Sequence, residues 1–521
     1  MTLSPPTALP AVRPSIGWAV ALAAVSLICL FVRRSRRSGL PLPPGPRGRF
    51  LVGNLGQVSA DHPERDYIRW GKEFDSDIIH LKVLGQHSIC LNTVEAATEL
   101  LDRRGSNYCD RPRFTLFEVM GWGLTLTFLR WGPQFKLHRS LFQKTFTQSN
   151  VKVFRPVQLH EARKAVRTLL VRPDAWEEAT LLMTTSIIFR IAFGQEIVDV
   201  SSPYCAMSAA ANEATTNGGI AGTSLVDVFP PARFLPDWLN PSAALRHARN
   251  SRAAIRTIHD VPWAASLKDI EAGEAPPSFM RTHYERLQES IRAGRPLEMT
   301  ERDVKGATGA IFIAGGNSTW STVLSNLLFL TKYPDAQRAI RDELDTVLDG
   351  GSRLPEFDDR TSLGSLDRFM QEVMRALPLN PLVIPHKSLR EDEFRGMRIP
   401  AGSVVFANAK AMGSDPRVYN DPERFDPDRY TRGEPYPNGN FGFGRRKCPG
   451  NFLAMATVYM FLATLLAVFE IEKAVGPDGK PVEPVPGVTI GLGGHPSPFQ
   501  CKLRLRNPAL AKLLAEGKDE A

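Results

Sequence analysis

The stretch "FGFGRRKCPG", residues 441–450, places a single cysteine, Cys448, among glycines, arginines and phenylalanines. Pro449 and Gly450 follow the cysteine, and after them comes the apolar, helix-forming run "NFLAMATVYMFLATLLAVF". Proline is favoured in the first turn of a helix, so we expect Cys448 at the positive end of a helix, where backbone N–H groups can point at sulfur. A cysteine binds a metal as the thiolate, and this setting stabilises the negative charge. The stretch therefore predicts a metal ligand.

The residues around the cysteine suit a flat ligand that carries carboxylates. Gly444 and Gly450 have no side chain, so the backbone can approach such a ligand closely. Arg446 offers a planar set of N–H donors to a carboxylate, and Phe441 can shield the sulfur from water. Together these features favour a haem iron with an axial thiolate and an ionised propionate.

The same ten residues match the haem-binding pattern F-x-x-G-x-R-x-C-x-G of the cytochrome P-450 family at every fixed position, and the chain resembles that family. The resemblance implies haem b (iron protoporphyrin IX) with Cys448 as the axial iron ligand. In this family a tryptophan usually stands four residues before the position of Arg139, where this chain has Phe135. The haem-binding residues that the resemblance implies are Phe441, Gly444, Arg446, Cys448, Gly450, Arg139 and His386.

A Glu/Arg pair also matches the family. Glu372 and Arg375 in "QEVMR" fit its E-x-x-R motif, and their i, i+3 spacing places them on one face of a helix. By itself, a Glu/Arg pair at this spacing more often lies on the solvent-exposed face of a helix. The motif "PERF", residues 422–425, supplies Arg424, and the resemblance places Arg424 with the pair in a buried charge network that holds the haem-side core.

The stretch "AGGNST", residues 314–319, aligns with the family's oxygen-activating A-G-x-D-T-T but departs from it. Asn317 replaces the acid and Ser318 the first threonine. An amide does not titrate, so we expect Asn317 to orient water while Ser318 and Thr319 carry the proton relay. The departure leaves two alternatives open: a haem-thiolate isomerase or dehydratase without net oxygen insertion, and a non-enzymatic haem- or sterol-binding membrane protein.

Most of the remaining chain has helical patterning. Thr300 and Asp303 form a capping-box pattern before a long apolar helix that ends before Tyr333-Pro334, and two amphipathic helices follow, "DAQRAIRDELDTVL" and "LDRFMQEVMRAL". Short β-prone runs appear from Pro378 onward. The predicted fold class is mainly α with a small β portion, and the resemblance implies the cytochrome P-450 fold over one catalytic domain, residues 47–521.

The N-terminus predicts a membrane anchor before this domain. Residues 16–32, "IGWAVALAAVSLICLFV", carry no charge, and a helix of that length spans about 26 Å, slightly less than the hydrocarbon core. The cluster "RRSRR" follows, which favours a cytoplasmic catalytic domain and a short luminal tail, residues 1–15. Residues 33–46 are basic and proline-rich and predict a stiff neck. We expect a single-pass protein of the endoplasmic reticulum membrane, although a cleaved signal or a buried helix would share this pattern.

The net charge of +9 comes mostly from one terminus. Residues 1–50 contain seven arginines and no acid, so the rest of the chain has 57 basic against 55 acidic residues, which argues against a nucleic-acid surface. The six cysteines include no C-x-x-C pair, which excludes a zinc knuckle.

The resemblance implies a monooxygenase that uses O2 and electrons from NADPH. The chain has no G-x-G-x-x-G after a strand, so a partner flavoprotein reductase should supply the electrons, and "RRK", residues 445–447, with Lys136 could form its basic docking face. Apolar pocket segments favour a hydrophobic small-molecule substrate. Similarity to fungal microsomal members suggests a terpenoid or polyketide of secondary metabolism.

Overall fold

The computed structural model describes residues 26, 39–219, 222, 224–239, 242–489 and 491–517. The predicted luminal tail and, except for Ser26, the predicted anchor at 16–32 lie outside the described residues. Within the described ranges, one helix is long and apolar enough to cross a membrane, α16 (Asn451–Val468). Most of α16 is buried inside the protein, so it is a core helix.

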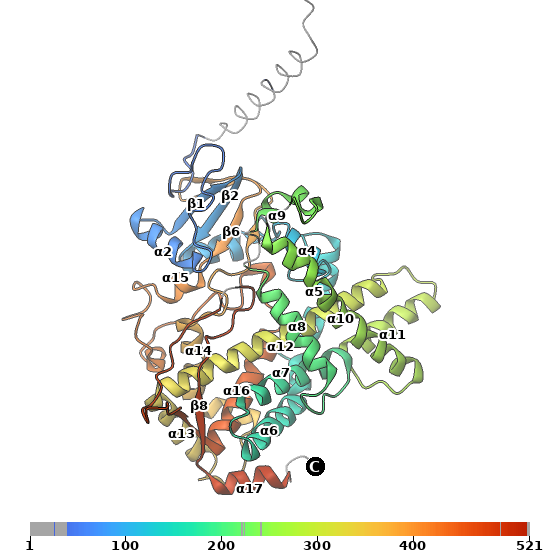
Figure 1. The fold of residues 1–521 in the computed structure, drawn as a ribbon, viewed down its shortest axis with the longest axis vertical. Helices are drawn as coiled ribbons and strands as arrows, with labels where there is room; N and C mark the ends of the chain where they lie inside the picture. The colour runs from blue at the N-terminus through green and yellow to red at the C-terminus, as the bar shows by residue number, and fades with distance from the viewer. Residues whose placement is uncertain are drawn as a thin grey trace, which may run out of the picture.

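The prediction of a mainly helical chain with a small β portion is confirmed (Figure 1). The helices are α2 (Pro63–Glu73), α3 (Val94–Ala97), α4 (Thr115–Met120), α5 (Pro133–Thr145), α6 (Arg155–Val171), α7 (Trp176–Phe193), α8 (Pro203–Thr216), α9 (Leu225–Val228), α10 (Ala243–Ala272), α11 (Phe279–Arg292), α12 (Glu301–Lys332), α13 (Pro334–Val347), α14 (Gly364–Ala376), α15 (Ala409–Gly413), α16 and α17 (Pro508–Glu516). The strands are β1 (Ile78–Val83), β2 (Gln86–Leu91), β3 (His386–Lys387), β4 (Asp392–Phe394), β5 (Met397–Ile399), β6 (Val404–Ala407), β7 (Phe469–Lys473) and β8 (Cys501–Leu505).

Helix α12 crosses the middle of the molecule, where Figure 1 shows it in yellow. It begins as expected, with the Thr300 hydroxyl accepting from the Asp303 N–H and the Asp303 carboxylate accepting from the Thr300 N–H at 3.0 Å. It ends at Lys332, before the Tyr333-Pro334 step that cannot continue a helix. Its 32 residues span about 48 Å and are largely buried, so α12 is the element around which α7, α11 and α16 pack.

The two amphipathic segments after α12 form α13 and α14, as the patterning predicts. The apolar run after Gly450 forms α16, whose residues from Thr457 to Val468 are buried. These helices, α6, α7 and α12 share one large hydrophobic core. The core holds the start of α16, and therefore the cysteine before it, at a constant position relative to α12.

The main sheet has the strand order β1-β2-β6-β3. β1 and β2 form an antiparallel hairpin, β2 runs parallel to β6 with Cys90 opposite Phe406, and β6 pairs antiparallel with β3. The sheet places His386, in β3, beside Val405 in the interior of the protein.

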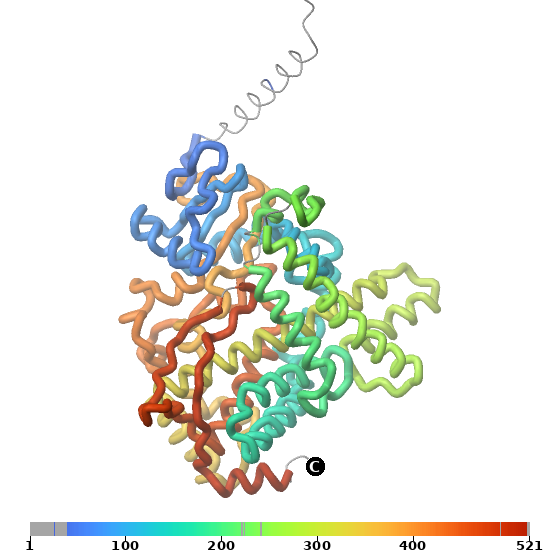
Figure 2. The backbone as a smooth tube through the Cα atoms, in the orientation of Figure 1, coloured from blue at the N-terminus to red at the C-terminus, as the bar shows by residue number. Residues whose placement is uncertain are grey.

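The described part of the predicted neck, residues 39–46, packs along this sheet and does not act as a free spacer. The Pro44 carbonyl accepts from the His80 N–H at 2.9 Å, and the Pro41 carbonyl accepts from the Arg398 N–H at 2.8 Å. A Cβ at Gly45 would lie 2.0 Å from the His80 carbonyl oxygen, so only glycine permits this contact. The folded body therefore begins before residue 47, as Figure 2 shows for the blue N-terminal segment.

Candidate active site

A cavity of about 370 Å³ lies between α12 and the loop before α16. Two stretches that the sequence singled out, 441–450 and 314–319, meet at its walls. Phe441, Cys448 and Gly450 border it from one side, and Ala314 and Ser318 from the other. Cys448 is the only cysteine that borders the cavity within the described residues.

The loop that carries Cys448 is held by short-range contacts. Gly444–Arg446 form a turn of 3-10 helix, and the Cys448 N–H then donates to the Phe441 carbonyl at 2.8 Å. Gly444 has φ +54°, and a Cβ there would lie 2.0 Å from the Leu101 carbonyl oxygen. Gly444 is not among the residues that border the cavity; it lets the loop pack on residues 101–102.

Cys448 opens to the cavity and lies three residues before Asn451, the first residue of α16, so Pro449 precedes the helix and is not in its first turn. Burial raises the pKa of its thiol, while the Gly450 backbone N–H and the Arg139 guanidinium lower it. A cation against the sulfur would complete the stabilisation of the thiolate, because a coordinated thiol is deprotonated outright. The surroundings of Cys448 thus fit an iron ligand.

Arg446 holds the loop to two other segments and keeps one donor for a ligand. Its Nε donates to the Cys109 carbonyl at 2.7 Å and its Nη1 to the Leu129 carbonyl at 2.8 Å. Its Nη2 is buried without a hydrogen-bond partner among the described residues. Its guanidinium lies 3.6 Å from the centre of the Phe135 ring, which occupies the place of the family's tryptophan. Burial lowers the pKa of Arg446 to about 10, so the side chain is a cation at neutral pH.

Arg111 is a buried cation that the sequence analysis did not single out. It borders the same cavity, and its Nη1 donates to the Pro385 carbonyl at 2.8 Å. Its Nε is buried without a partner in the described chain. The only sequence signal was an arginine next to proline in "DRPRF", which resembles an ordinary turn.

The other two predicted propionate partners differ in position, because Arg139 borders the cavity and His386 does not. Arg139 donates to the Lys447 carbonyl at 2.6 Å. His386 donates from Nδ1 to the Tyr108 carbonyl at 2.8 Å, and its Nε2 is buried and unpartnered in the described ranges. Burial and the nearby Arg111 lower the pKa of His386 well below its usual value. His386 is therefore neutral, and its free Nε2 is an acceptor that a propionate cannot satisfy. The buried, unsatisfied donors of Arg446 and Arg111 need an anion, so this side of the cavity fits ionised haem propionates.

The stretch 314–319 lies on one continuous part of α12, and all three predicted relay residues border the cavity. The Ser318 hydroxyl donates to the Ala314 carbonyl at 2.6 Å, and the Thr319 hydroxyl to the Gly315 carbonyl at 2.6 Å. The Asn317 Oδ1 is buried and has no partner among the described groups. Asn317 is therefore the group here that most needs a water or a ligand.

The charge network of the haem-side core has a different third member from the one expected. Glu372 pairs with Arg375 at 2.8 Å, and the Arg429 Nε donates to the Glu372 Oε1 at 3.1 Å. The Arg424 side chain is exposed, and this residue contributes only its carbonyl, to Arg375 at 3.2 Å and Arg429 at 2.8 Å. The prediction for Arg424 is thus wrong, because the 3-10 turn Pro427–Tyr430 directs the side chain of Arg429 inward.

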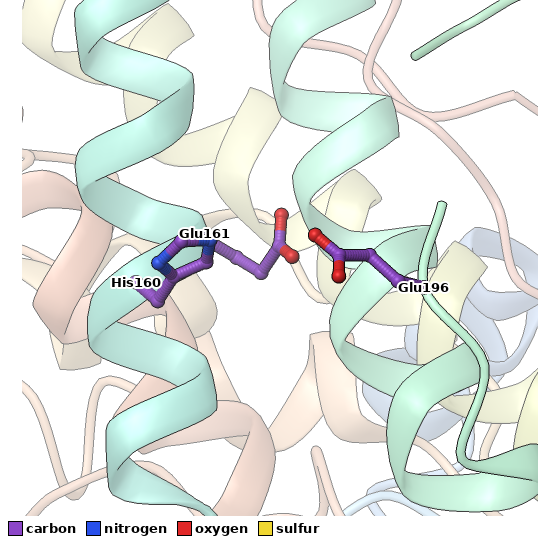
Figure 3. A group of neighbouring side chains, drawn as sticks. All are labelled: His160, Glu161 and Glu196. Atoms are coloured by element: carbon purple, nitrogen blue, oxygen red, sulfur yellow. The ribbon is translucent and has the colours of Figure 1, made fainter. Parts of the chain in front are cut away.

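A separate group of possible metal ligands lies away from the cavity. His160 and Glu161 of α6 and Glu196, in the loop after α7, bring their ligand atoms within 4.8 Å of one another (Figure 3). It is the one such group in the part of the chain that the structure describes. None of the three residues borders the cavity, so the group does not belong to this site.

Comparison with known proteins agrees with this geometry. The family model for cytochrome P450 matches residues 43–503. A cytochrome P450 monooxygenase of Armillaria gallica is 34% identical, covering 94% of this chain and 97% of its own. The tryptamine 4-monooxygenase of Psilocybe cyanescens is 34% identical, covering 94% and 98%. The cytochrome P450 monooxygenase ple1 of Rhodocybe pseudopiperita is 31% identical, covering 89% and 90%.

Proposed function

Because this chain belongs to the cytochrome P450 family, we propose that it oxidises a hydrophobic product of secondary metabolism, a terpenoid or a polyketide, at the endoplasmic reticulum membrane. The chain is a haem-thiolate monooxygenase, and a redox partner supplies its electrons. One oxygen atom of O2 enters a C–H bond of the substrate, and two electrons and two protons reduce the other oxygen atom to water. The observation that carries the proposal is the single cavity that unites Cys448, the buried arginines and the hydroxyl-bearing face of α12.

Four side chains would hold the haem. Cys448 would bind the iron, while Arg446, Arg111 and Arg139 would donate to the propionates. Haem, when bound, supplies the oxygen activation that no side chain can perform. The protein would fix the position of this group and exclude bulk water with an apolar wall, and α12 contributes polar groups to the same cavity.

We assign the handling of protons to Asn317 and Ser318. The Ser318 hydroxyl already donates to the Ala314 carbonyl, so its free lone pair can accept from a water in the cavity. The unpartnered Oδ1 of Asn317 can accept from the same water or a neighbouring one. Rotation of the Ser318 hydroxyl would then pass a proton toward the cavity while the amide holds the water.

The walls support a hydrophobic substrate. Apolar side chains come from α5, α7 and α12 and from the loop after residue 490; examples are Phe142, Ile187, Ile311 and Leu492. The assignment to terpenoids or polyketides rests on similarity to fungal monooxygenases. One relative of this degree of similarity is named for a different substrate, tryptamine.

Exposed apolar side chains support attachment to a membrane. Phe50 and Leu51 are 91% and 82% exposed, and Phe234 and Trp238 are 76% and 82% exposed. The segments that carry them lie at one end of the long axis in Figure 1, where the described chain begins. Such side chains can enter the interfacial layer of a bilayer, and the preceding "RRSRR" cluster places the catalytic domain on the cytoplasmic side.

A basic surface next to the Cys448 loop supports docking of an acidic reductase. The Arg445 guanidinium lies 5.5 Å from the centre of the Trp131 ring, and the Lys136 ammonium lies 5.3 Å from it. Arg445 belongs to the Cys448 loop and Lys136 to α5. Lys447 is exposed beside them. Complementary charge at this surface would steer the partner toward the proximal side of the site.

The test is to express the full chain with a fungal NADPH-dependent reductase, supply candidate terpenes and polyketides under heavy dioxygen, and measure product masses. The proposal expects a product with one labelled oxygen atom and the carbon monoxide spectrum of thiolate-bound ferrous haem in the wild type. Labelled product from neither substrate class, in cells that show the spectrum, would contradict the substrate assignment. Absence of the spectrum would contradict haem-thiolate binding itself.

A further inference from the structure

The roof of the cavity contains buried polar atoms that nothing in the described protein satisfies. Trp122, Thr125 and Asn212 border the cavity, and Trp122 Nε1, Thr125 Oγ1 and Asn212 Oδ1 are buried without a hydrogen-bond partner among the described residues. The three residues are 1%, 3% and 6% exposed. Buried polar groups in proteins are almost always hydrogen bonded, so these atoms require a partner within the cavity.

Other polar side chains around the cavity do not share this property. The hydroxyls of Thr184, Thr215 and Thr322 donate to backbone carbonyls one turn earlier in their own helices. Asn380 accepts from the Gly493 N–H at 3.2 Å. The three unsatisfied groups of the roof differ from these satisfied side chains, and they come from α8 and from the loop after α4.

Trp122 and Thr125 belong to the segment between α4 and α5, which also binds Arg446 through the Leu129 carbonyl, whereas Asn212 belongs to α8. α8 and α4 both pack on α10, and α8 also packs on α12. The remaining unsatisfied cavity atoms belong to Arg111 and Arg446, which the propionates would satisfy, and to Asn317 on α12. The roof atoms have no such role.

The chemistry of the three atoms limits their partner. An indole N–H only donates and an amide oxygen only accepts, while a hydroxyl does both. A hydroxyl group meets both demands, and a carbonyl meets the demand of Trp122 or Thr125. A hydrocarbon would leave all three atoms unpaired.

The charge of the walls limits the partner further. Among the described residues that border the cavity, the charged ones are Arg111, Arg139 and Arg446, and there is no carboxylate. A buried cationic ligand would lack a counter-ion, which is strongly unfavourable.

We infer that the substrate is a neutral, largely apolar molecule that already carries at least one hydroxyl or carbonyl group, bound by Asn212, Trp122 and Thr125; this inference rests on the proposed function. A reaction that places oxygen on the carbon skeleton therefore precedes the step catalysed here. These three residues select an oxygenated intermediate over its parent hydrocarbon. They position the substrate and take no part in proton transfer.

The test uses two matched pairs of probes, adamantane with 1-adamantanol and cedrene with cedrol. The dissociation constant of each is measured from the absorbance change of the haem in the purified, full-length holoenzyme. Asn212→Leu should weaken binding of at least one alcohol about tenfold while the matching hydrocarbon binds equally or more tightly. Trp122→Phe is a second variant that should act in the same direction. Thr184→Val, whose hydroxyl is already satisfied, is the matched control and should change the hydrocarbon-to-alcohol ratio less than twofold.

Two results would overturn the inference. One is that neither Asn212→Leu nor Trp122→Phe changes the ratio of the hydrocarbon and alcohol dissociation constants in either pair. Failure of both alcohols to bind the wild type counts as this result. The other is binding of 1-adamantyltrimethylammonium as tight as that of 1-adamantanol. The carbon monoxide spectrum of the wild type distinguishes failure of the proposed function from failure of this inference. Absence of the spectrum counts against the proposed function, whereas its presence with an unchanged ratio of dissociation constants counts against this inference alone.

Discussion

Replacing Arg429 with alanine should destabilise the protein far more than replacing Arg424, although both arginines stand in a proline-x-arginine-aromatic motif. Arg429 is 1% exposed. Its guanidinium contacts Glu372 at 3.1 Å and Glu434 at 2.6 Å, and it donates to the carbonyls of Asn420 and Arg424 at 2.9 Å and 2.8 Å. The side chain of Arg424 is exposed and contributes no such contact.

The magnitude follows from what the substitution leaves behind. Removing one partner of a buried ion pair typically costs about 3–5 kcal/mol, because the other charge remains buried. In Arg429→Ala the Glu372 carboxylate would still bind Arg375 and the Tyr430 hydroxyl, each at 2.8 Å. These contacts limit the free-energy cost of leaving this carboxylate buried. The carbonyls that lose their donor add to the cost, so we expect about 3–5 kcal/mol in total for Arg429→Ala. Arg424→Ala should change the free energy of unfolding by about 0.5 kcal/mol or less.

The assay is urea unfolding of the haem-loaded protein, followed by loss of the thiolate-bound carbon monoxide spectrum. Arg429→Ala should lower the urea midpoint strongly and reduce the yield of holoenzyme, whereas Arg424→Ala should match the wild type. Arg429→Lys is informative too, because a lysine keeps the charge but cannot reach the two carboxylates and the carbonyls at once. Equal loss in the two alanine variants, or a neutral Arg429→Ala, would refute the assignment of the network.

Three further predictions concern the site and its surroundings. Cys448→Ser should remove the spectrum of thiolate-bound ferrous haem with carbon monoxide while the far-ultraviolet circular dichroism stays unchanged; a retained spectrum would contradict iron ligation by Cys448. Ser318→Ala should raise the peroxide released per NADPH consumed, with Thr322→Val measured beside it as the control. Equal product formation per NADPH in Ser318→Ala and the wild type would show that Ser318 is not part of the proton relay. Burial lowers the pKa of His283 to about 4, so the unfolded state takes up a proton first as the pH falls below 6.5 and stability is lost between pH 6.5 and 4. His283→Phe should therefore recover about 2 kcal/mol of this acid-induced loss at pH 5 in urea titrations, and an identical pH profile in the variant would count against a neutral buried His283.

Features that depend on neighbours in the chain could be predicted from the sequence. The capping box at Thr300, the stop before Pro334 and the glycine-rich turn before Cys448 each act over a few residues, and the structure has the helices and the loop at those places. Hydrophobic patterning likewise located α13, α14 and α16. The replacement of a tryptophan by Phe135 could be read from the motif, although its consequence, an arginine stacked on the ring at 3.6 Å, could not.

By itself, the sequence determined the family, the cysteine predicted to bind iron and the order of the main helices, because these rest on short motifs and local backbone preferences. Tertiary structure alone decided that Arg111 and Arg429 are buried. Arg111 and Arg429 had nothing local to set them apart from surface arginines, and their roles follow from carbonyls and carboxylates brought to them by distant segments. The unsatisfied atoms of the cavity roof are of the same kind, since a side chain is left without a partner only when the elements around it have packed.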